Sequence, residues 1–266
     1  MTDAILASGE PRAGEPPPGE PVIDRAFRIL NAFGPDHRSL SLAALSARTR
    51  LPKPTALRIA RKLSDWGALE RADNGEYVIG LRLLELASLA PRGHGLRATA
   101  LPYLEDLHHS TGQHVLLAVR DGNEAVLIER LSARRAGRVL YRVGGRMPLH
   151  STGVGLVLLA HSPAHVQEDV LSGDLRLDPA ERIWPSARDL RVTLAAIRRD
   201  GVAVASRQLP EPMTSVAAPI TNGSSQTVAA LSVVTRSGQT DPASLRPAVV
   251  AIARAVSRAV SASGGS

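Results

Sequence analysis

Apolar residues recur every three or four positions along residues 54–66, and this spacing predicts an amphipathic helix. Its core stripe is predicted to comprise Ala56, Ile59, Ala60, Leu63 and Trp66. The other side carries polar and cationic side chains, namely Thr55, Arg58, Arg61 and Lys62, with Lys53 just ahead of the first turn. A shorter helix is predicted before it, capped by Ser41, stopped by Leu51-Pro52 and buried through Leu42, Leu45 and Ala47.

Residues 68–71 and 76–79 are rich in strand-forming side chains and flank Asp73-Asn74-Gly75. An Asn-Gly pair between such runs is a strong hairpin signal. A helix, a turn, a helix and a hairpin predict a winged helix-turn-helix, with Arg71 and Arg82 placed to touch DNA phosphate. The cationic helix suits the major groove because arginine bonds guanine edges, and lysine and threonine hold phosphates. A merely solvated helix face is the alternative that the charge pattern alone leaves open.

Three segments resemble the N-terminal domain of the IclR family of bacterial transcriptional regulators: VIDRAFRILNAFG, SLAALSARTRLPKPTALRIARKLSDWGALER and NGEYVIGLRLLELA. The resemblance implies a DNA-binding domain over residues 22–82. Its expected DNA-binding residues are Lys53, Thr55, Arg58, Arg61, Lys62 and Arg71. Pro54 and Leu57 stand where serine and tyrosine are frequent in the family, so the operator sequence is not carried over.

Charge agrees with this interpretation. Residues 22–82 carry 11 Lys and Arg against 6 Asp and Glu, and phosphate binding requires such a basic module. A second, acid-free cluster comprises Arg134, Arg135, Arg138, Arg142 and Arg146. It could form an exposed loop or partner surface, a lid near an anionic ligand or a further DNA contact, and we favour the first. Residues 1–21 are rich in proline and glycine and are expected to form a disordered tail.

Leucines occupy more than one face of the predicted helix that follows the hairpin, from Leu81 to Leu89. A helix that is apolar around so much of its circumference needs cover from outside its own domain. The resemblance implies that residues 83–97 form a linker helix that packs in a homodimer, with a dimer of dimers also open. Two winged helices would then read two half-sites of double-stranded operator DNA about 34 Å or multiples apart.

From Ala98 onward the pattern alternates between short strands and helices. It predicts a helix ending at Gly112, a hairpin over 114–130, a strand over 139–143, helices at 165–171 and 187–199, strands at 202–209, 215–220 and 226–235, and a last helix over 243–261. This order predicts an α+β domain with a largely antiparallel sheet over residues 98–262. The resemblance implies that this is a GAF-like effector-binding and oligomerisation domain.

The glycine-rich stretch Gly144–Gly155 runs into an apolar helix capped by Ser151 or Thr152. Unpaired N–H groups and the helix dipole would attract a carboxylate or phosphate to the beginning of this helix. The site would be lined by Ser151, Thr152, Gly153 and Val154. No dinucleotide fingerprint or Walker lysine accompanies it, and an ordinary capped helix is the alternative. GRMPLHSTGVGLVLLA, TSVAAPI and VAALSVV are similar to motifs of the IclR effector domain, which implies a pocket at Gly153, Val154, Ser215 and Ser232.

Several residues depart from the family pattern around this pocket. Ser215 stands where many members have cysteine, Val234 replaces a common serine, and Leu156 replaces the usual lysine. Residues 205–208 replace an acidic run. If these side chains face the pocket, it is less acidic and more apolar than usual. We therefore expect an effector that is larger or more hydrophobic than a two- or three-carbon acid.

Taken together, the sequence predicts a bacterial transcriptional regulator that responds to a small organic acid or related metabolite, with repression as the more usual outcome in the family. The chain has no cysteine, no apolar run near the ~20 residues of a membrane span and no secretion signal, so the cytoplasm is expected. No cofactor is expected, and His165 with Glu168 is only a weak metal-binding pattern. The alternatives are a DNA-binding module without a ligand and a hydrolase using Ser151 with His150 in the Gly144–Gly155 loop, although no Gly-x-Ser-x-Gly elbow is present.

Overall fold

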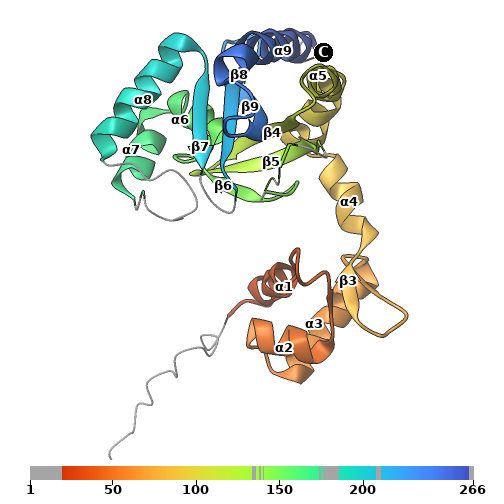
Figure 1. Cartoon of the computed structure of the whole chain (residues 1–266). Coiled ribbons are helices and arrows are strands. Elements are labelled where there is room, and N and C mark those ends of the chain that lie inside the picture. The colour runs from red at the N-terminus through yellow and green to blue at the C-terminus, as the bar shows by residue number, and fades with distance from the viewer. Residues whose placement is uncertain are drawn as a thin grey trace, which may run out of the picture. The chain divides into compact units, whose positions relative to one another are not determined.

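The structure of the protein is a computed structural model that describes residues 20–133, 136–137, 139, 141–173, 175, 186–207 and 211–263. The chain divides into two compact units, Met1–Leu89 and Ala90–Ser266, which are described separately (Figure 1). Most of the expected disordered tail, residues 1–19, lies outside the described residues.

In the described part of the N-terminal unit, the helices α1 (Val22–Asn31), α2 (Leu42–Thr49) and α3 (Lys53–Trp66) surround one small apolar core. The Ser41 hydroxyl caps α2 by accepting a hydrogen bond from the Ala44 N–H at 3.2 Å. Strands β2 (Leu69–Arg71) and β3 (Tyr77–Ile79) form the predicted hairpin. A third strand that the pattern did not reveal, β1 (Ser39–Leu40), pairs with β3 and completes an antiparallel sheet. The winged helix-turn-helix is confirmed.

Two predicted core positions in this unit are exposed. Trp66 lies in the last turn of α3, is 51% exposed and has the Arg82 guanidinium 5.9 Å from its ring centre. Ala47 is also exposed, because the buried side of α2 is formed by Leu45 and Thr49, four residues apart. Trp66 has the spacing of the buried stripe but lies beyond the small core, whereas Ala47 lies two residues from Leu45 and therefore points to the other side of α2.

The leucine-rich segment after the wing forms α4 (Leu81–Ser88), which has no buried residue. Its apolar side chains Leu81, Leu84 and Leu86 are exposed, as is Leu89 just beyond it. A short π-helix (Pro91–Gly95) separates α4 from α5 (Leu96–Thr111), so the segment expected as one linker helix consists of several pieces.

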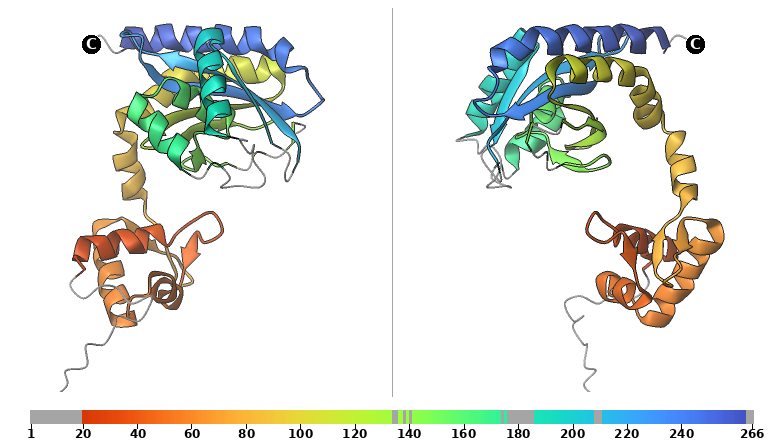
Figure 2. Two further views of the ribbon diagram at one scale, coloured as in Figure 1. Left: turned by 90° about the vertical axis from the view of Figure 1, so that its left-hand side faces the viewer. Right: turned by 45° about the vertical axis from the view of Figure 1, so that its right-hand side comes forward.

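The C-terminal unit is an α+β domain with a six-stranded sheet in the order β6-β5-β4-β9-β8-β7, and every neighbouring pair is antiparallel. The strands are β4 (His114–Asp121), β5 (Glu124–Leu131), β6 (Arg146–Pro148), β7 (Ala203–Arg207), β8 (Met213–Thr221) and β9 (Thr227–Arg236). One face packs against α5 and α9 (Pro242–Ser263), which lie side by side in Figure 2. The other face packs against α6 (Gly153–Ala160), with α7 (Ala164–Ser172) and α8 (Ala187–Asp200) beyond it.

The predicted strand over 139–143 is wrong. Among the described residues of that range none is in a strand, and β6 begins at Arg146 instead. A glycine pair precedes it: the Gly144 N–H donates to the Leu127 carbonyl at 2.7 Å, and the Leu127 N–H donates to the Gly145 carbonyl at 3.0 Å. Gly144 has a φ of +77°, which favours glycine, so the chain turns here before it can pair with β5.

Candidate functional site

The first candidate site is the exposed side of α3. Ala56, Ile59 and Ala60 of this helix are buried. The predicted cations Lys53, Arg58, Arg61 and Lys62 are all exposed, and Thr55 is half-buried beside them. Lys62 pairs with Asp65 at 3.6 Å in the last turn, whereas Lys53, Arg58 and Arg61 form no ion pair with another described residue. These cations are therefore available to an anionic partner.

The second part of this surface is the wing. Arg71 is exposed at the end of β2, and its Nε donates to the Gly75 carbonyl at 3.0 Å. Its guanidinium also lies 5.6 Å from the centre of the Tyr77 ring. Arg82 differs, since it pairs with Glu85 at 2.7 Å as well as packing over Trp66. The hairpin therefore holds the Arg71 guanidinium in place without removing its charge from solvent.

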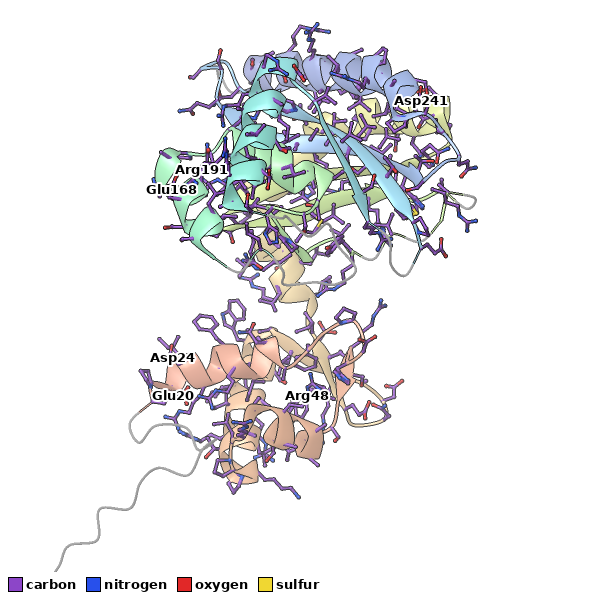
Figure 3. The ribbon with its side chains drawn as sticks, turned by 60° about the vertical axis from the view of Figure 1, so that its left-hand side comes forward. Glu20, Asp24, Arg48, Glu168, Arg191 and Asp241 are labelled. Carbon is purple, nitrogen blue, oxygen red and sulfur yellow. The ribbon has the colours of Figure 1, made fainter. Side chains whose placement is uncertain are left out.

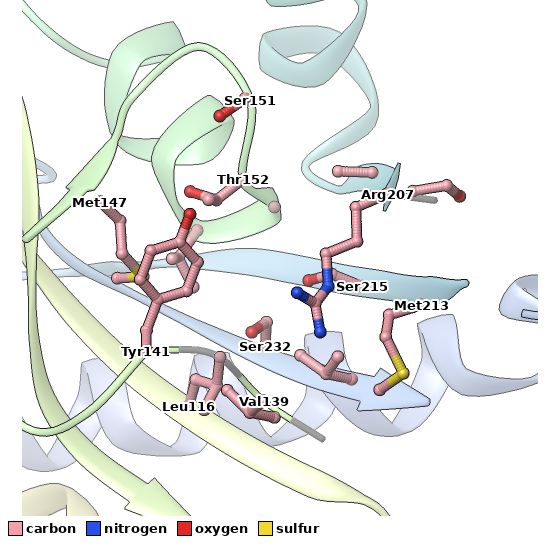
Figure 4. A pocket seen from close by; sticks show the side chains of 15 residues that line it. Leu116, Val139, Tyr141, Met147, Ser151, Thr152, Arg207, Met213, Ser215 and Ser232 are labelled. Carbon is pink, nitrogen blue, oxygen red and sulfur yellow. The ribbon is translucent and has the colours of Figure 1, made fainter. Parts of the chain in front are cut away.

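The second candidate site is a cavity in the C-terminal unit, with an empty volume of about 520 Å³ including its open mouth. Figure 4 shows it between α6, the strands of the sheet and the segment around Tyr141. The lining comprises Leu116, Val139, Tyr141, Met147, Ser151, Thr152, Gly153, Val154, Ala205, Ser206, Arg207, Met213, Ser215, Ser232 and Val234.

The beginning of α6 is shaped by its cap and by two glycines. Thr152 Oγ1 accepts a hydrogen bond from the Gly155 N–H at 3.1 Å and donates to the Pro148 carbonyl at 3.1 Å. A Cβ atom on Gly153 would lie 2.3 Å from Ser215 Oγ, and one on Gly155 would lie 2.5 Å from the Pro148 carbonyl oxygen. Glycine is thus required for α6 to approach the sheet closely. The first N–H groups of the helix, which have no partner within it, begin at the cavity wall.

The sheet contributes one face of three neighbouring strands. Ala205 is opposite Ser215, which in turn is opposite Val234. Two residues along, Ala217 is opposite Ser232. Alternate residues of a strand point to the same face, so Ser215 and Ser232 present their hydroxyls on the side that α6 covers.

The structure brings all six predicted effector residues, Ser151, Thr152, Gly153, Val154, Ser215 and Ser232, to this one cavity. Of the residues that depart from the family pattern, Val234 and the 205–207 segment also line it. Leu156 does not, because it is fully buried in the core of the unit, and Gln208 lies outside the described residues. None of the described lining residues is Asp or Glu, as the prediction of a less acidic cavity requires.

Sequence reasoning missed the aromatic side chain and several apolar side chains of the lining, namely Tyr141, Leu116, Val139, Met147 and Met213. Tyr141 reaches the cavity because Arg130 of β5 holds its carbonyl through an Nη1–H bond of 2.6 Å. The preceding segment is fixed by His114, whose Nδ1 accepts from the Ala133 N–H at 3.1 Å while Nε2 donates to the Gly137 carbonyl at 2.9 Å. Burial lowers the pKa of His114 and favours this neutral form. No local sequence signal marks these long-range contacts.

The other expectations have mixed outcomes. Ser151 lines the cavity, and His150 is not among its described lining residues. Glu168 pairs with Arg191 at 2.6 Å, as Figure 3 shows, and no group of three metal-ligating residues occurs in the part of the chain that is described. No described helix is both long and apolar enough to span a membrane.

The arginine cluster is only partly visible, since Arg134, Arg135 and Arg138 lie outside the described residues. Arg142 is exposed, and Arg146 pairs with Asp121 at 2.7 Å and with Glu124 at 3.0 Å. This guanidinium lowers the pKa of the Asp121 carboxyl. Arg146 therefore holds together the β4–β5 hairpin to which β6 is paired.

Comparison with known proteins covers both units. Residues 22–73 match the model of the IclR helix-turn-helix domain, and residues 90–262 match that of the bacterial transcriptional regulator IclR C-terminal domain. The HTH-type transcriptional regulator XynR of Escherichia coli is 30% identical over 84% of this chain and 89% of its own length. The glycerol operon regulatory protein of Streptomyces coelicolor is 30% identical over 90% and 94%, respectively.

A solved structure shows the same arrangement of secondary structure. It is an IclR homolog from Microbacterium hydrocarbonoxydans complexed with 4-hydroxybenzoate. It is 32% identical to this chain, superposes with a TM-score of 0.85, and the match covers 91% of this chain and 100% of that one.

Proposed function

Because the chain belongs to the IclR family of bacterial transcriptional regulators, we propose that a small organic acid binds the cavity of its C-terminal unit and thereby changes its affinity for operator DNA. The protein is a ligand-responsive, DNA-binding transcriptional regulator and not an enzyme. The hydrolase alternative is therefore withdrawn.

The proposed DNA interface consists of Lys53, Thr55, Arg58, Arg61 and Lys62 on α3 together with Arg71 on the wing. Exposed arginines of a groove-entering helix can read guanine edges, while lysine, threonine and the wing arginine neutralise phosphate. The absence of ion pairs at Arg58 and Arg61 among the described residues supports this assignment, because no internal partner has to be displaced by DNA.

The proposed effector is an organic acid with an apolar body. The observation that supports this most is the lining itself, in which hydroxyls and the start of α6 adjoin the apolar side chains Leu116, Val154 and Val234. The homolog complexed with 4-hydroxybenzoate supports the same class, since that ligand is a carboxylate on an aromatic ring. An acid of two or three carbons would leave most of these apolar side chains without a contact, whereas a longer or aromatic body can cover them.

We further propose that the protein acts in the cytoplasm, where the chromosome is, as a homodimer that can pair into a dimer of dimers. Exposed Leu81, Leu84 and Leu89 support an assembly, because water-exposed leucines gain stability when a second copy covers them. A dimer would also place two α3 helices on two half-sites. We expect effector binding to release a repressor from DNA.

A titration tests this function directly. The purified chain is incubated with labelled DNA from upstream of its own gene, and fluorescence anisotropy is followed while benzoate, 4-hydroxybenzoate, hexanoate or pyruvate is added. We expect nanomolar to micromolar DNA binding that an aromatic or medium-chain acid weakens and pyruvate does not. Binding to no upstream fragment, or tightest binding of pyruvate, would overturn the proposal.

A further inference from the structure

The effector cavity contains one charged side chain among its described lining residues, Arg207 at the end of β7. Figure 4 shows its guanidinium pointing into the cavity on the Ser215 side, with the Tyr141 ring on the opposite side in this view. We propose that Arg207 determines effector specificity: its guanidinium binds the effector carboxylate, so the effector is a monocarboxylate whose remaining body is uncharged and largely apolar. This inference rests on the proposed effector-binding function and narrows it to one chemical class.

The strand register explains how Arg207 reaches this position. Arg207 lies directly opposite Met213 of β8, two residues along β7 from Ala205, which faces Ser215. Arg207, Ala205, Met213 and Ser215 therefore share the sheet face that forms the cavity floor. Because β7 is the edge strand, a long side chain at its end can extend across this floor from the rim. A change of register by one residue would turn the guanidinium to the other face.

The electrostatics of the lining favour one negative charge. None of the described lining residues carries a carboxylate that would repel an anionic ligand, and one of them, Arg207, carries a positive charge. Arginine binds carboxylates through two parallel N–H donors, and such charge-assisted bonds are stronger where water is partly excluded. Arg207 is only half-exposed, which places its charge in such surroundings.

The other lining residues indicate which chemical groups the remainder of the ligand should carry. The apolar side chains Leu116, Val139, Met147, Val154, Met213 and Val234 suit a hydrocarbon body. Tyr141 and Thr152 lie on the far side from Arg207 in Figure 4 and can pair with one uncharged polar group, such as a hydroxyl. A second carboxylate there would have no cationic side chain among the described lining residues, and burying such a charge is costly. The cavity should therefore discriminate against dicarboxylates.

A competing arrangement places the carboxylate at the beginning of α6, where unpaired N–H groups also attract anions. The two arrangements predict different results when Arg207 is changed. If α6 holds the carboxylate, loss of the guanidinium leaves the preference for an acid over its amide intact. If Arg207 holds it, that preference disappears.

The experiment measures the preference for an acid over its own amide by calorimetric titration of the full chain. The probe pairs are benzoate with benzamide and hexanoate with hexanamide, and terephthalate is added as a dicarboxylate. We expect the unchanged protein to bind the acid of at least one pair roughly 10- to 100-fold more tightly than its amide. In Arg207→Gln this ratio should fall to about one, whereas Arg207→Lys should retain part of it because the charge remains.

Arg199→Gln is the matched control. Arg199 is exposed at the end of α8, pairs with the adjacent Asp200 at 2.8 Å and does not line the cavity, so its loss should leave the ratio unchanged. A variant is taken as folded if its melting temperature without ligand lies within a few degrees of that of the unchanged protein. If Arg207→Gln does not fold, the acid-over-amide ratio is compared between Arg207→Lys and the unchanged protein.

The outcomes separate the two proposals. If the unchanged protein binds an acid and Arg207→Gln binds it with the same preference over the amide, the assignment to Arg207 is wrong but the effector function stands. Preference for terephthalate over benzoate in the unchanged protein would also overturn the assignment. If the unchanged protein binds none of the acids and its DNA binding ignores them, the proposed function fails and this inference fails with it.

Discussion

The exposed side of α3 displays several cations to solvent, whereas the described lining of the C-terminal cavity contains one arginine among apolar and hydroxyl-bearing side chains. Exposed charges keep their hydration and are screened by salt, so they supply affinity that any phosphate backbone can use. A charge in a partly enclosed cavity is screened less and can discriminate between small ligands. Our proposals therefore give the same residue type two roles, general attraction to DNA in one unit and selectivity between ligands in the other.

The largest effect is expected where the cavity wall is tightest. Gly153→Ala places a Cβ atom 2.3 Å from Ser215 Oγ, so α6 must move away from the sheet. We expect acid binding to be lost and stability to fall by about 1–3 kcal/mol, as for other overpacked cores. Calorimetric titration and urea unfolding measure the two effects.

The matched control for this change lies in the other unit. Nothing lies within 4 Å of a Cβ added to Gly34, so Gly34→Ala should leave acid binding unchanged. DNA binding by the Gly153→Ala protein should persist in the absence of acid. Retention of full acid affinity in that protein would contradict the close approach of α6 to Ser215.

The next effect concerns the exposed cations. Arg58→Ala should weaken binding to the operator by roughly 1–3 kcal/mol more than binding to random DNA, because a base contact carries sequence information. Arg71→Ala should weaken both and lower the slope of affinity against salt concentration by about one. Anisotropy titrations on both duplexes at several salt concentrations measure these changes.

Arg254, exposed on α9 of the C-terminal unit, provides a control with the same loss of charge. Arg254→Ala should change neither the operator preference nor the salt slope. Equal losses on operator and random duplexes for Arg58→Ala would show that this residue contacts phosphate and not a base. Neither arginine change should alter acid binding.

A smaller effect is expected from removing one helix cap in each unit. Ser41→Ala removes the acceptor of the Ala44 N–H in α2, and Thr152→Ala removes that of the Gly155 N–H in α6. Each should cost about 1 kcal/mol. Thr152→Ala should cost more, because the hydroxyl also donates to the Pro148 carbonyl.

Amide hydrogen exchange locates these losses. Protection should fall at Ala44 in Ser41→Ala and at Gly155 in Thr152→Ala, and only the second change should weaken acid binding. The comparison between the units is contradicted if Ser41→Ala weakens acid binding as much as Thr152→Ala does.

The smallest effect is a pH dependence confined to the C-terminal unit. Burial lowers the pKa of His114 below its ordinary value of about 6.5, with Arg130 and His108 opposing its protonation as well. The unfolded chain therefore takes up this proton first, so stability present above about pH 6.5 is lost as the pH falls below it. Protonation also puts a hydrogen on Nδ1, which could then no longer accept from the Ala133 N–H.

Melting temperatures between pH 5 and pH 8 test this. His114→Gln should reduce the decline at low pH, whereas His165→Gln, at an exposed position on α7, should not. If the melting temperature falls equally at low pH in all three proteins, groups other than His114 cause the fall.

The sequence alone determined what depends on neighbours within a few turns of the chain. Helical spacing identified the cations of α3, the Asn74-Gly75 pair identified the wing, and the Thr152 cap with its glycines identified the beginning of α6. These features could be predicted because side-chain periodicity, turn chemistry and helix capping are local.

Only the tertiary structure decided which residues meet across long distances. It left Trp66 exposed, turned the chain at Gly144 where a strand was expected, and kept Leu156 out of the cavity. It also placed Arg207 on the cavity floor and brought Leu116 opposite Ser232. Such long-range contacts depend on strand register and on the extent of each core. Both result from packing between segments that are remote in sequence.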